Sequence, residues 1–267
     1  MINTLLLGKP GLSMLNDALD MAAKLLNTEY TETHPDYLYV DLPENKKVIG
    51  VDNILPVVEK GCKKPVLAEH AVAVINHMDC LTDAAQNKLL LTLESNCFLC
   101  VIGVAYRDTL LSTVKSRMKI LEYRPISKKD FITLYKDFSK KDSLLLYHAT
   151  GGCPGLVPSL SDNIGMFHEL YDICQGKNPH RIMDVLHLVK EKDPLAVHND
   201  KQLLLAVIHV LEYAMVERAF GVLSSDATAA TGIVCAINRL LEDESLCQTS
   251  CYTKDNFFRT IAFLTEI

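Results

Sequence analysis

The sequence predicts an α/β domain built on a parallel sheet, followed by a second part made only of helices. Short apolar runs alternate with segments of helical periodicity as far as Tyr123, which favours a parallel sheet with helices on both faces. The run Ala71–Ile75 is continuously apolar, as is typical of a central strand covered on both sides. After Pro125, the apolar residues recur mainly at helical spacing, which predicts helices from there onward.

Size and charge restrict the kind of protein. The 267 residues are 49% hydrophobic, enough for two or three modest domains with buried cores. A formal net charge of −6 does not suit a protein that holds DNA by itself. No apolar run approaches the roughly 18 residues of a membrane span, and no basic region precedes the apolar start, which indicates a strand and not a signal peptide. We therefore expect a cytoplasmic protein without membrane contact.

The nine cysteines are scattered along the chain, which favours buried, reduced thiols. Cys97 and Cys100 form a C-x-x-C pair, and Cys247 and Cys251 form a C-x-x-x-C pair. One C-x-x-C pair without a second pair or histidines is a weak zinc signal. No metal site is therefore expected.

The first apolar run leads into the turn Gly8-Lys9-Pro10-Gly11 and a helix that Ser13 can cap. This is the setting of a phosphate loop, which needs G-x-x-x-x-G-K-S/T so that amides cradle phosphates, the lysine reaches them and the hydroxyl holds Mg²⁺. Here Gly8 and Gly11 are only three apart, and Lys9 lies inside the turn. The pattern predicts a vestigial, empty phosphate loop, which is physically the same as an ordinary strand-to-helix turn.

Further elements follow at regular intervals. A strand is predicted at 37–40, because Pro35 pushes the preceding residue out of the helical region and an apolar run follows. The apolar run 71–75 is the next predicted strand. Thr82 or Asp83 can cap a helix that ends near Ser95, and a strand is predicted at 98–104.

Two motifs in this stretch carry a resemblance to a known family. Residues 82–94 are Thr-Asp-Ala-Ala-Gln-Asn-Lys-Leu-Leu-Leu-Thr-Leu-Glu, and residues 110–117 are Leu-Leu-Ser-Thr-Val-Lys-Ser-Arg. Their order and spacing resemble the clamp-loader AAA+ family, in which A-x-N-A-L-L-K-T-L-E-E, a strand and L-L-x-T-I-x-S-R-C follow one another. The delta-prime subunits of the bacterial DNA polymerase III clamp loader are the most similar members. The resemblance covers mainly residues 34–124.

At several positions this chain differs from the members of the resembling family that bind and hydrolyse nucleotides. An active member ends the strand 71–75 in Asp-Glu, of which the first orients Mg²⁺ and the second activates water. This chain has Asn76 and His77 there, a vestigial acidic site. Val104 and Ala105 stand near the position of the family's phosphate-sensing polar residue, and Leu156 stands where its sensing arginine often lies. The resemblance therefore implies a degenerate site without a cofactor or intrinsic ATPase activity.

Arg117, with Ser116 before it, remains the candidate for chemistry. In related subunits the matching arginine reaches the ATP of a neighbouring subunit, so the resemblance implies a trans-acting arginine finger. A guanidinium suits this role because it is always charged and its donors match phosphate oxygens. The alternative is a surface arginine paired with a carboxylate at a helix end.

The resemblance implies three domains: an AAA+-like α/β domain over 1–124, a small helical lid over 125–162 and an all-α collar for oligomerisation over 163–267. Helices are expected at 128–138, 143–149, 178–189, 203–223, 231–241 and 257–264.

The function implied is that of a non-hydrolysing scaffold subunit of a clamp loader. Its implied partners are the gamma/tau and delta subunits and, indirectly, the sliding clamp and primer–template DNA. Two alternatives stay open. One is an active ATPase with an unusual site that uses Lys9 and His77, and the other is a diverged interaction module outside replication.

Overall fold

The computed structural model describes residues 2–28, 31–44, 46–94, 98–176, 197–222 and 227–248. The chain divides into two compact units, Met1–Pro125 and Ile126–Ile267. The helices expected at 178–189 and 257–264 lie outside the described residues, as do Cys97 and Cys251. The proposed bounds of the lid and the collar stay predictions.

The first unit is built on a five-stranded sheet in the order β2-β3-β4-β1-β5, and every neighbouring pair is parallel. β3 and β4 lie inside the sheet and are buried along their whole length. β5 was not predicted, because it has only two apolar residues between two charged ones and remains mostly exposed at the sheet edge. The strands are β1 Thr4–Leu7, β2 Tyr37–Val40, β3 Ala71–Ile75, β4 Leu99–Ala105 and β5 Lys119–Glu122.

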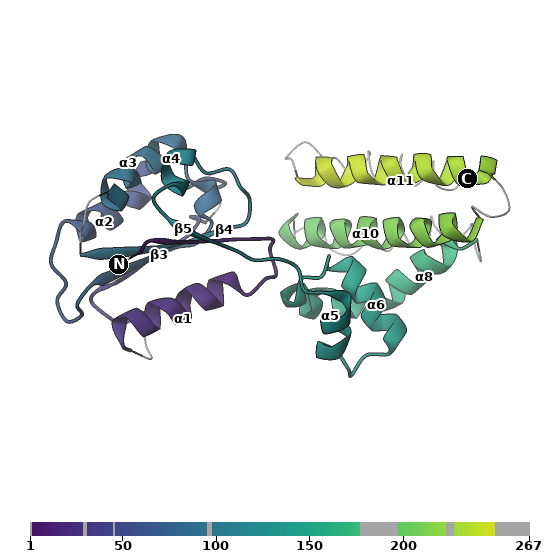
Figure 1. Ribbon diagram of the computed structural model, residues 1–267, viewed down its shortest axis with the longest axis horizontal. Helices are drawn as coiled ribbons and strands as arrows, with labels where there is room; N and C mark the ends of the chain where they lie inside the picture. The colour runs from purple at the N-terminus through teal and green to yellow at the C-terminus, as the bar shows by residue number, and fades with distance from the viewer. Residues whose placement is uncertain are drawn as a thin grey trace. The chain divides into compact units, whose positions relative to one another are not determined.

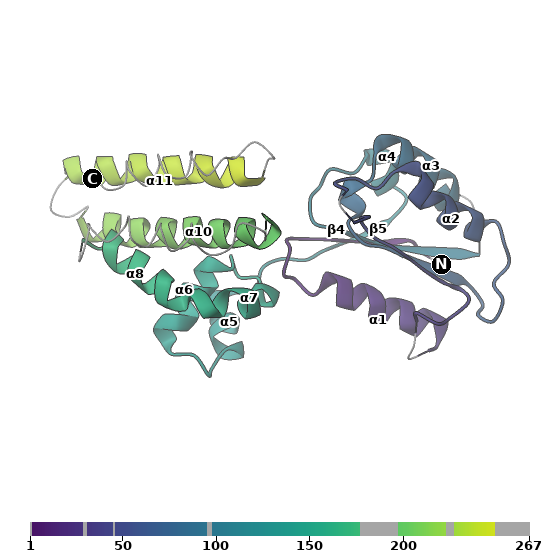
Figure 2. The ribbon, with the colours of Figure 1, turned by 180° about the vertical axis from the view of Figure 1, so that it is seen from behind.

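Helices cover both faces of this sheet, as the alternation predicted. α1 lies alone on one face, and α2, α3 and α4 lie on the other (Figures 1 and 2). Side chains from α2 and α3 share one apolar core with the sheet, including Ile54, Val57 and Leu89. The helical elements of this unit are α1 Met14–Leu26, α2 Val51–Gly61, η1 Met78–Cys80, α3 Asp83–Glu94 and α4 Ser112–Lys115.

A buried carboxylate fixes the loop between α2 and β3. Asp36 precedes β2, is 0% exposed, and accepts hydrogen bonds from the backbone amides of Val66, Leu67 and Ala68 at 2.7, 2.7 and 2.9 Å. Lys60 Nζ lies 3.5 Å from the carboxylate. Burial alone would raise the pKa of Asp36, but the three amide donors outweigh it and hold the pKa at about 2.

The described part of the second unit is helical, as predicted. An apolar core joins residues of the longer helices described there, among them Phe131, Phe167 and Leu211. Its helical elements are α5 Lys128–Leu134, α6 Lys140–Ala149, η2 Pro154–Leu156, α7 Val157–Leu160, η3 Ser161–Asn163, α8 Ile164–Cys174, α10 Val197–Val222 and α11 Ala227–Gln248.

Capping decided where two of these helices begin. The Ser127 side chain accepts from the amide of Asp130 at 3.2 Å and caps α5, which begins at the predicted residue, Lys128. Ser139 caps α6 in the same way, through the amide of Asp142 at 3.1 Å. The helix expected at 143–149 begins three residues earlier, at Lys140, because a serine oxygen that satisfies a first-turn amide favours a helix start there.

Two titratable groups with opposite pKa shifts lie in the second unit. The His148 ring stacks on Tyr213 with the ring centroids 3.7 Å apart, and burial, followed by the charge of Lys128, lowers the pKa of His148 to about 4. On α10, burial and the charge of Glu244 raise the pKa of Glu212 to about 7. Charging either group therefore destabilises the fold.

Glu212→Gln should raise the free energy of unfolding at pH 8 by ~1–2 kcal/mol, after a discount for partial solvent exposure. The folded pKa of Glu212 lies above its ordinary value of 4.5, so its penalty is absent below about pH 4.5 and grows until the pH passes 7. Urea unfolding at pH 8 and pH 4.5 measures this. The exposed Glu242 of α11 supplies the control Glu242→Gln. An equal gain at both pH values would contradict the prediction.

Candidate functional site

Three backbone amides of the turn between β1 and α1 donate hydrogen bonds to carbonyl oxygens of the chain itself. The amide of Gly8 donates to the carbonyl oxygen of Ala105 at 3.1 Å, that of Leu12 to Lys9 at 3.4 Å, and that of Met14 to Leu12 at 2.6 Å. In a phosphate loop such amides point at the ligand. The turn is instead tightened by these bonds and by Gly11, whose φ is +82°.

Side chains also fill the space behind this turn. Met14 opens α1 and is fully buried. A Cβ on Gly8 would lie 2.8 Å from the carbonyl oxygen of Tyr123 and 3.0 Å from the sulfur of Met14, so only glycine fits. Lys9 and Pro10 are exposed. Ser13 occupies the predicted cap position, but its side chain makes no capping hydrogen bond.

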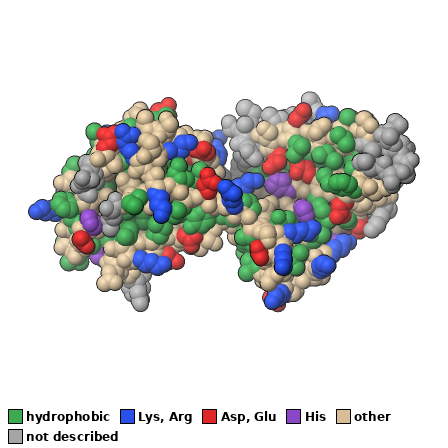
Figure 3. Space-filling view, in the orientation of Figure 1, with side chains coloured by type: hydrophobic (Ala, Val, Ile, Leu, Met, Phe, Trp, Pro, Cys, Tyr) green, Lys and Arg blue, Asp and Glu red, His purple; other side chains and the backbone are tan. Residues whose placement is uncertain are grey.

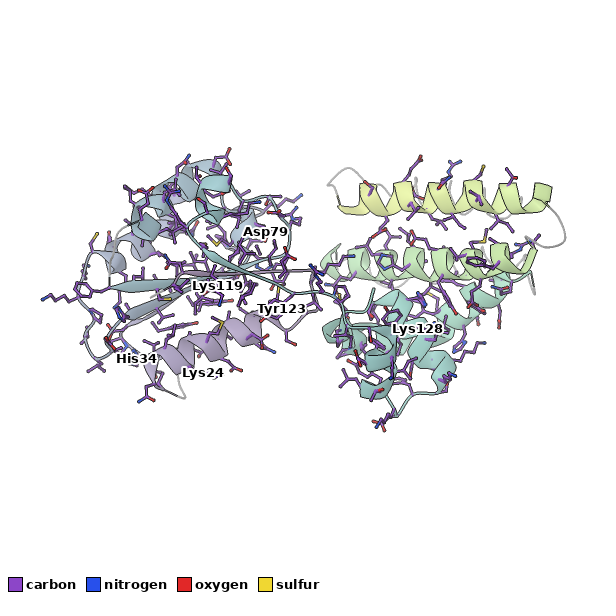
Figure 4. The ribbon with its side chains drawn as sticks, in the orientation of Figure 1. Lys24, His34, Asp79, Lys119, Tyr123 and Lys128 are labelled. Atoms are coloured by element: carbon purple, nitrogen blue, oxygen red, sulfur yellow. The ribbon has the colours of Figure 1, made fainter. Side chains whose placement is uncertain are left out.

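The first turn of α1 carries a negative charge. Tyr123 lies beside this turn (Figure 4), and its hydroxyl donates to Asp17 Oδ2 at 2.7 Å. Burial, together with the hydrogen bond to Asp17, raises the pKa of Tyr123 to about 12. A helix N-terminus attracts anions, but a carboxylate already placed there repels a phosphate.

A polar cluster lies at the carboxyl ends of β2, β3 and β4, and we call Asp41, Asn76, His77 and Tyr106 the edge cluster. Asn76 is 3% exposed, donates to Asp41 Oδ2 at 3.1 Å and accepts from the Tyr106 hydroxyl at 3.2 Å. His77 Nδ1 lies 2.8 Å from Asp41 Oδ1, and its ring packs on Tyr106 with centroids 4.9 Å apart. The cluster thus links three neighbouring strand ends.

The carboxylate of the edge cluster is surrounded by donors. Besides Asn76 and His77, the Tyr39 hydroxyl donates to Asp41 at 2.7 Å and the Leu42 amide at 2.6 Å. Burial would raise the pKa of Asp41, but the hydrogen bonds from Asn76, Tyr39 and His77 outweigh it, so the pKa is lowered. Mg²⁺ needs oxygen ligands, and the oxygens of Asp41 already accept hydrogen bonds from the chain itself.

A second carboxylate near the same edge is paired with an arginine. Asp79, which is labelled in Figure 4, is buried and accepts hydrogen bonds from the Tyr106 amide at 3.0 Å and from Arg107 Nε at 3.0 Å. This pairing raises the pKa of Arg107. Sequence reasoning missed Asp79, Arg107, Asp41 and Tyr106. Asp41 directly follows the predicted strand 37–40, and Tyr106 lies two residues beyond the predicted strand 98–104. This position is the signal that could have found them, since parallel strands end at a shared edge.

Arg117 follows α4 and is held within its own chain. Its Nη1 donates to the carbonyl oxygen of Thr113 at 2.7 Å and lies 3.4 Å from Ser116 Oγ, and its Nη2 forms an ion pair with Glu94, the last residue of α3. The side chain is 34% exposed. Met118 beside it is buried in the core. The free chain thus has the carboxylate pairing that the sequence left as the alternative.

The remaining predicted positions are apolar and packed. Val104 and Ala105 are fully buried in β4. Leu156 lies in η2 and packs against the core of the second unit. Among the described residues, no group of three metal-ligating side chains comes together, and no helix is long and apolar enough to span a membrane.

Comparison with known proteins points to one family. Residues 18–127 match the family described as DNA polymerase III, delta subunit. Over 103 residues the chain is 33% identical to the DNA polymerase III subunit delta' of Escherichia coli K12, which covers 38% of this chain and 31% of that protein. The chain therefore aligns with about a third of that relative's length.

A solved structure extends the likeness of fold to the second unit. The gamma subunit-related protein of DNA polymerase III from Thermotoga maritima superposes with a TM-score of 0.54 at 14% identity, over 99% of this chain and 94% of that one. At this identity the match concerns the fold alone.

Proposed function

We propose that the chain is a delta-prime-like protein of the clamp-loader family and a non-hydrolysing subunit of a clamp loader. The family match over residues 18–127, the 33% identity to a delta' subunit and the fold shared with a gamma subunit-related protein support this proposal. In this proposal the chain acts as a scaffold that offers Arg117 to ATP held by an adjacent subunit during sliding-clamp loading. Its own nucleotide site is degenerate.

One observation carries the proposal: both halves of the ancestral nucleotide site are occupied by the chain's own groups. On the phosphate side, Met14 fills the space behind Gly8, and Asp17 places a negative charge in the first turn of α1. On the metal side, Asn76 and His77 bind Asp41. Each change alone would weaken nucleotide binding, and together they oppose both the phosphates and their metal.

Arg117 is the group that supports a role toward a neighbour. It is partly exposed, and its contacts with Glu94, Thr113 and Ser116 leave some of its five N–H donors for phosphate oxygens. A guanidinium placed at the transferring phosphoryl group stabilises the charge that spreads over its oxygens. The chain would thus contribute one positive charge, held in a defined position, to the ATP site of the neighbouring subunit.

The partners belong to the proposal as well. We propose that the chain assembles with the ATP-binding gamma/tau subunits and the delta subunit in the cytoplasm, and through them meets the sliding clamp and primer–template DNA. On the face drawn in Figure 3, basic side chains are interspersed with acidic and hydrophobic ones. With a net charge of −6, this favours indirect over direct contact with DNA.

The isolated chain should not bind Mg-ATP measurably at millimolar nucleotide, because the amides of Gly8, Leu12 and Met14 are used internally and Asp17 places a negative charge in the first turn of α1. Isothermal titration calorimetry measures this, with a gamma/tau subunit as the binding control. Tight binding that Lys9→Ala or His77→Ala abolishes would instead support the active ATPase. Failure of native gamma/tau and delta subunits to co-purify with the chain would support an interaction module outside replication.

A further inference from the structure

The contact between Glu94 and Arg117 joins the ends of two packed elements, and the proposed function assigns no role to Glu94. Arg117 is held at two points, through Nη2 by the Glu94 carboxylate and through Nη1 by the carbonyl oxygen of Thr113 at 2.7 Å. Two points fix the plane of a guanidinium. These contacts, with Ser116 Oγ, use at most three of its five N–H donors.

The backbones of Glu94 and Arg117 belong to packed segments of the first unit. Glu94 ends α3, whose Ala85, Leu89 and Leu93 are buried in the core under the helix. The buried side chain of Gln86 on the same helix accepts from the amide of Leu111, the residue before α4, at 2.8 Å. The distance between the Glu94 and Arg117 backbones is therefore set by packing.

The exposure of the pair argues against a role in folding. The Glu94 side chain is 47% exposed and that of Arg117 is 34% exposed. Ion pairs of such exposure contribute little to stability. What the pair does provide is order: an arginine side chain has many rotamers, and holding it in one orientation before association lowers the cost of placing it on a ligand.

We infer that Glu94 is a positioning residue for Arg117. Its carboxylate holds the guanidinium in the orientation from which the remaining donors reach the phosphate oxygens across the subunit interface. The inference rests on the proposed function, because it assigns Glu94 a role only if Arg117 acts on a neighbour's ATP.

The test is a double-mutant cycle in the complex reconstituted with gamma/tau and delta. Glu94→Gln should lower the kcat of ATP hydrolysis at the neighbouring site about five- to ten-fold with little change in KM, since misplacement of a catalytic group costs rate and not ground-state binding. Glu94→Asp should restore part of that loss. Glu94→Gln with Arg117→Ala should equal Arg117→Ala alone. The matched control is Glu122→Gln, which breaks the exposed 3.1 Å pair with Arg124.

The outcomes separate the inference from the proposed function. If Arg117→Ala lowers turnover and Glu94→Gln leaves it unchanged or raises it, the positioning role is overturned and the arginine finger stands. A double variant slower than Arg117→Ala would show that Glu94 acts elsewhere, which also overturns the inference. If Arg117→Ala itself changes nothing, the proposed function fails. Thermal melting of each isolated chain verifies that the variants are folded.

Discussion

Arg117→Ala should lower ATP turnover at the neighbouring subunit's site by about 10³-fold, the lower end of what an arginine finger contributes. The physical reason is that alanine leaves the charge spreading over the transferring phosphoryl group without its counter-charge. The isolated chain should keep its stability, because the pairs that Arg117 makes are exposed. Steady-state hydrolysis and clamp loading by the reconstituted complex measure the effect.

Two matched variants sharpen this experiment. Arg117→Lys keeps the charge but loses the forked donors, so it should recover only a small part of the rate. Arg124→Ala removes a nearby arginine whose side chain is 83% exposed, and it should leave turnover unchanged. Assembly is verified by gel filtration. Unchanged turnover in an intact complex that contains Arg117→Ala would reduce Arg117 to a surface residue.

Asp36→Asn should lower the free energy of unfolding at pH 7 by about 2 kcal/mol, because three backbone amides lose charge-assisted hydrogen bonds to a buried carboxylate. The folded pKa of about 2 lies below the ordinary value of 3.8. The carboxylate therefore stabilises the fold fully above about pH 4 to 5, and this contribution is lost as the pH falls through 2.

Urea unfolding at pH 7 and pH 3 measures the effect of Asp36→Asn, and the difference from the wild type should be smaller at the lower pH. Asp20→Asn, at an exposed position of α1, is the control and should change stability by only a few tenths of a kcal/mol. A loss of the same size at both pH values would show that the charge of Asp36 is not what holds the loop of Val66, Leu67 and Ala68.

Local pattern was sufficient for most of the fold. The continuous apolar run of β3 and the helical spacing of α1 and α3 predicted their elements, because burial against a sheet demands those periods. β5 was not predicted, because an edge strand buries little apolar surface and its sequence therefore shows only a weak hydrophobic pattern. The start of α6 was predicted too late, because Ser139 lies among charged residues that are typical of a turn.

The sequence by itself determined that Gly8 and Gly11 lie only three residues apart, unlike the glycines of a phosphate loop, and that Asn76 and His77 follow the apolar run 71–75, since identity and spacing are properties of the chain alone. Tertiary structure decided what those residues do instead. Only the folding of a parallel sheet brings Asp41 and Tyr106 to Asn76 and His77, and only the packing of α3 against the sheet brings Glu94 to Arg117. Such contacts join positions 23 to 36 residues apart, and no local pattern specifies which donor meets which acceptor.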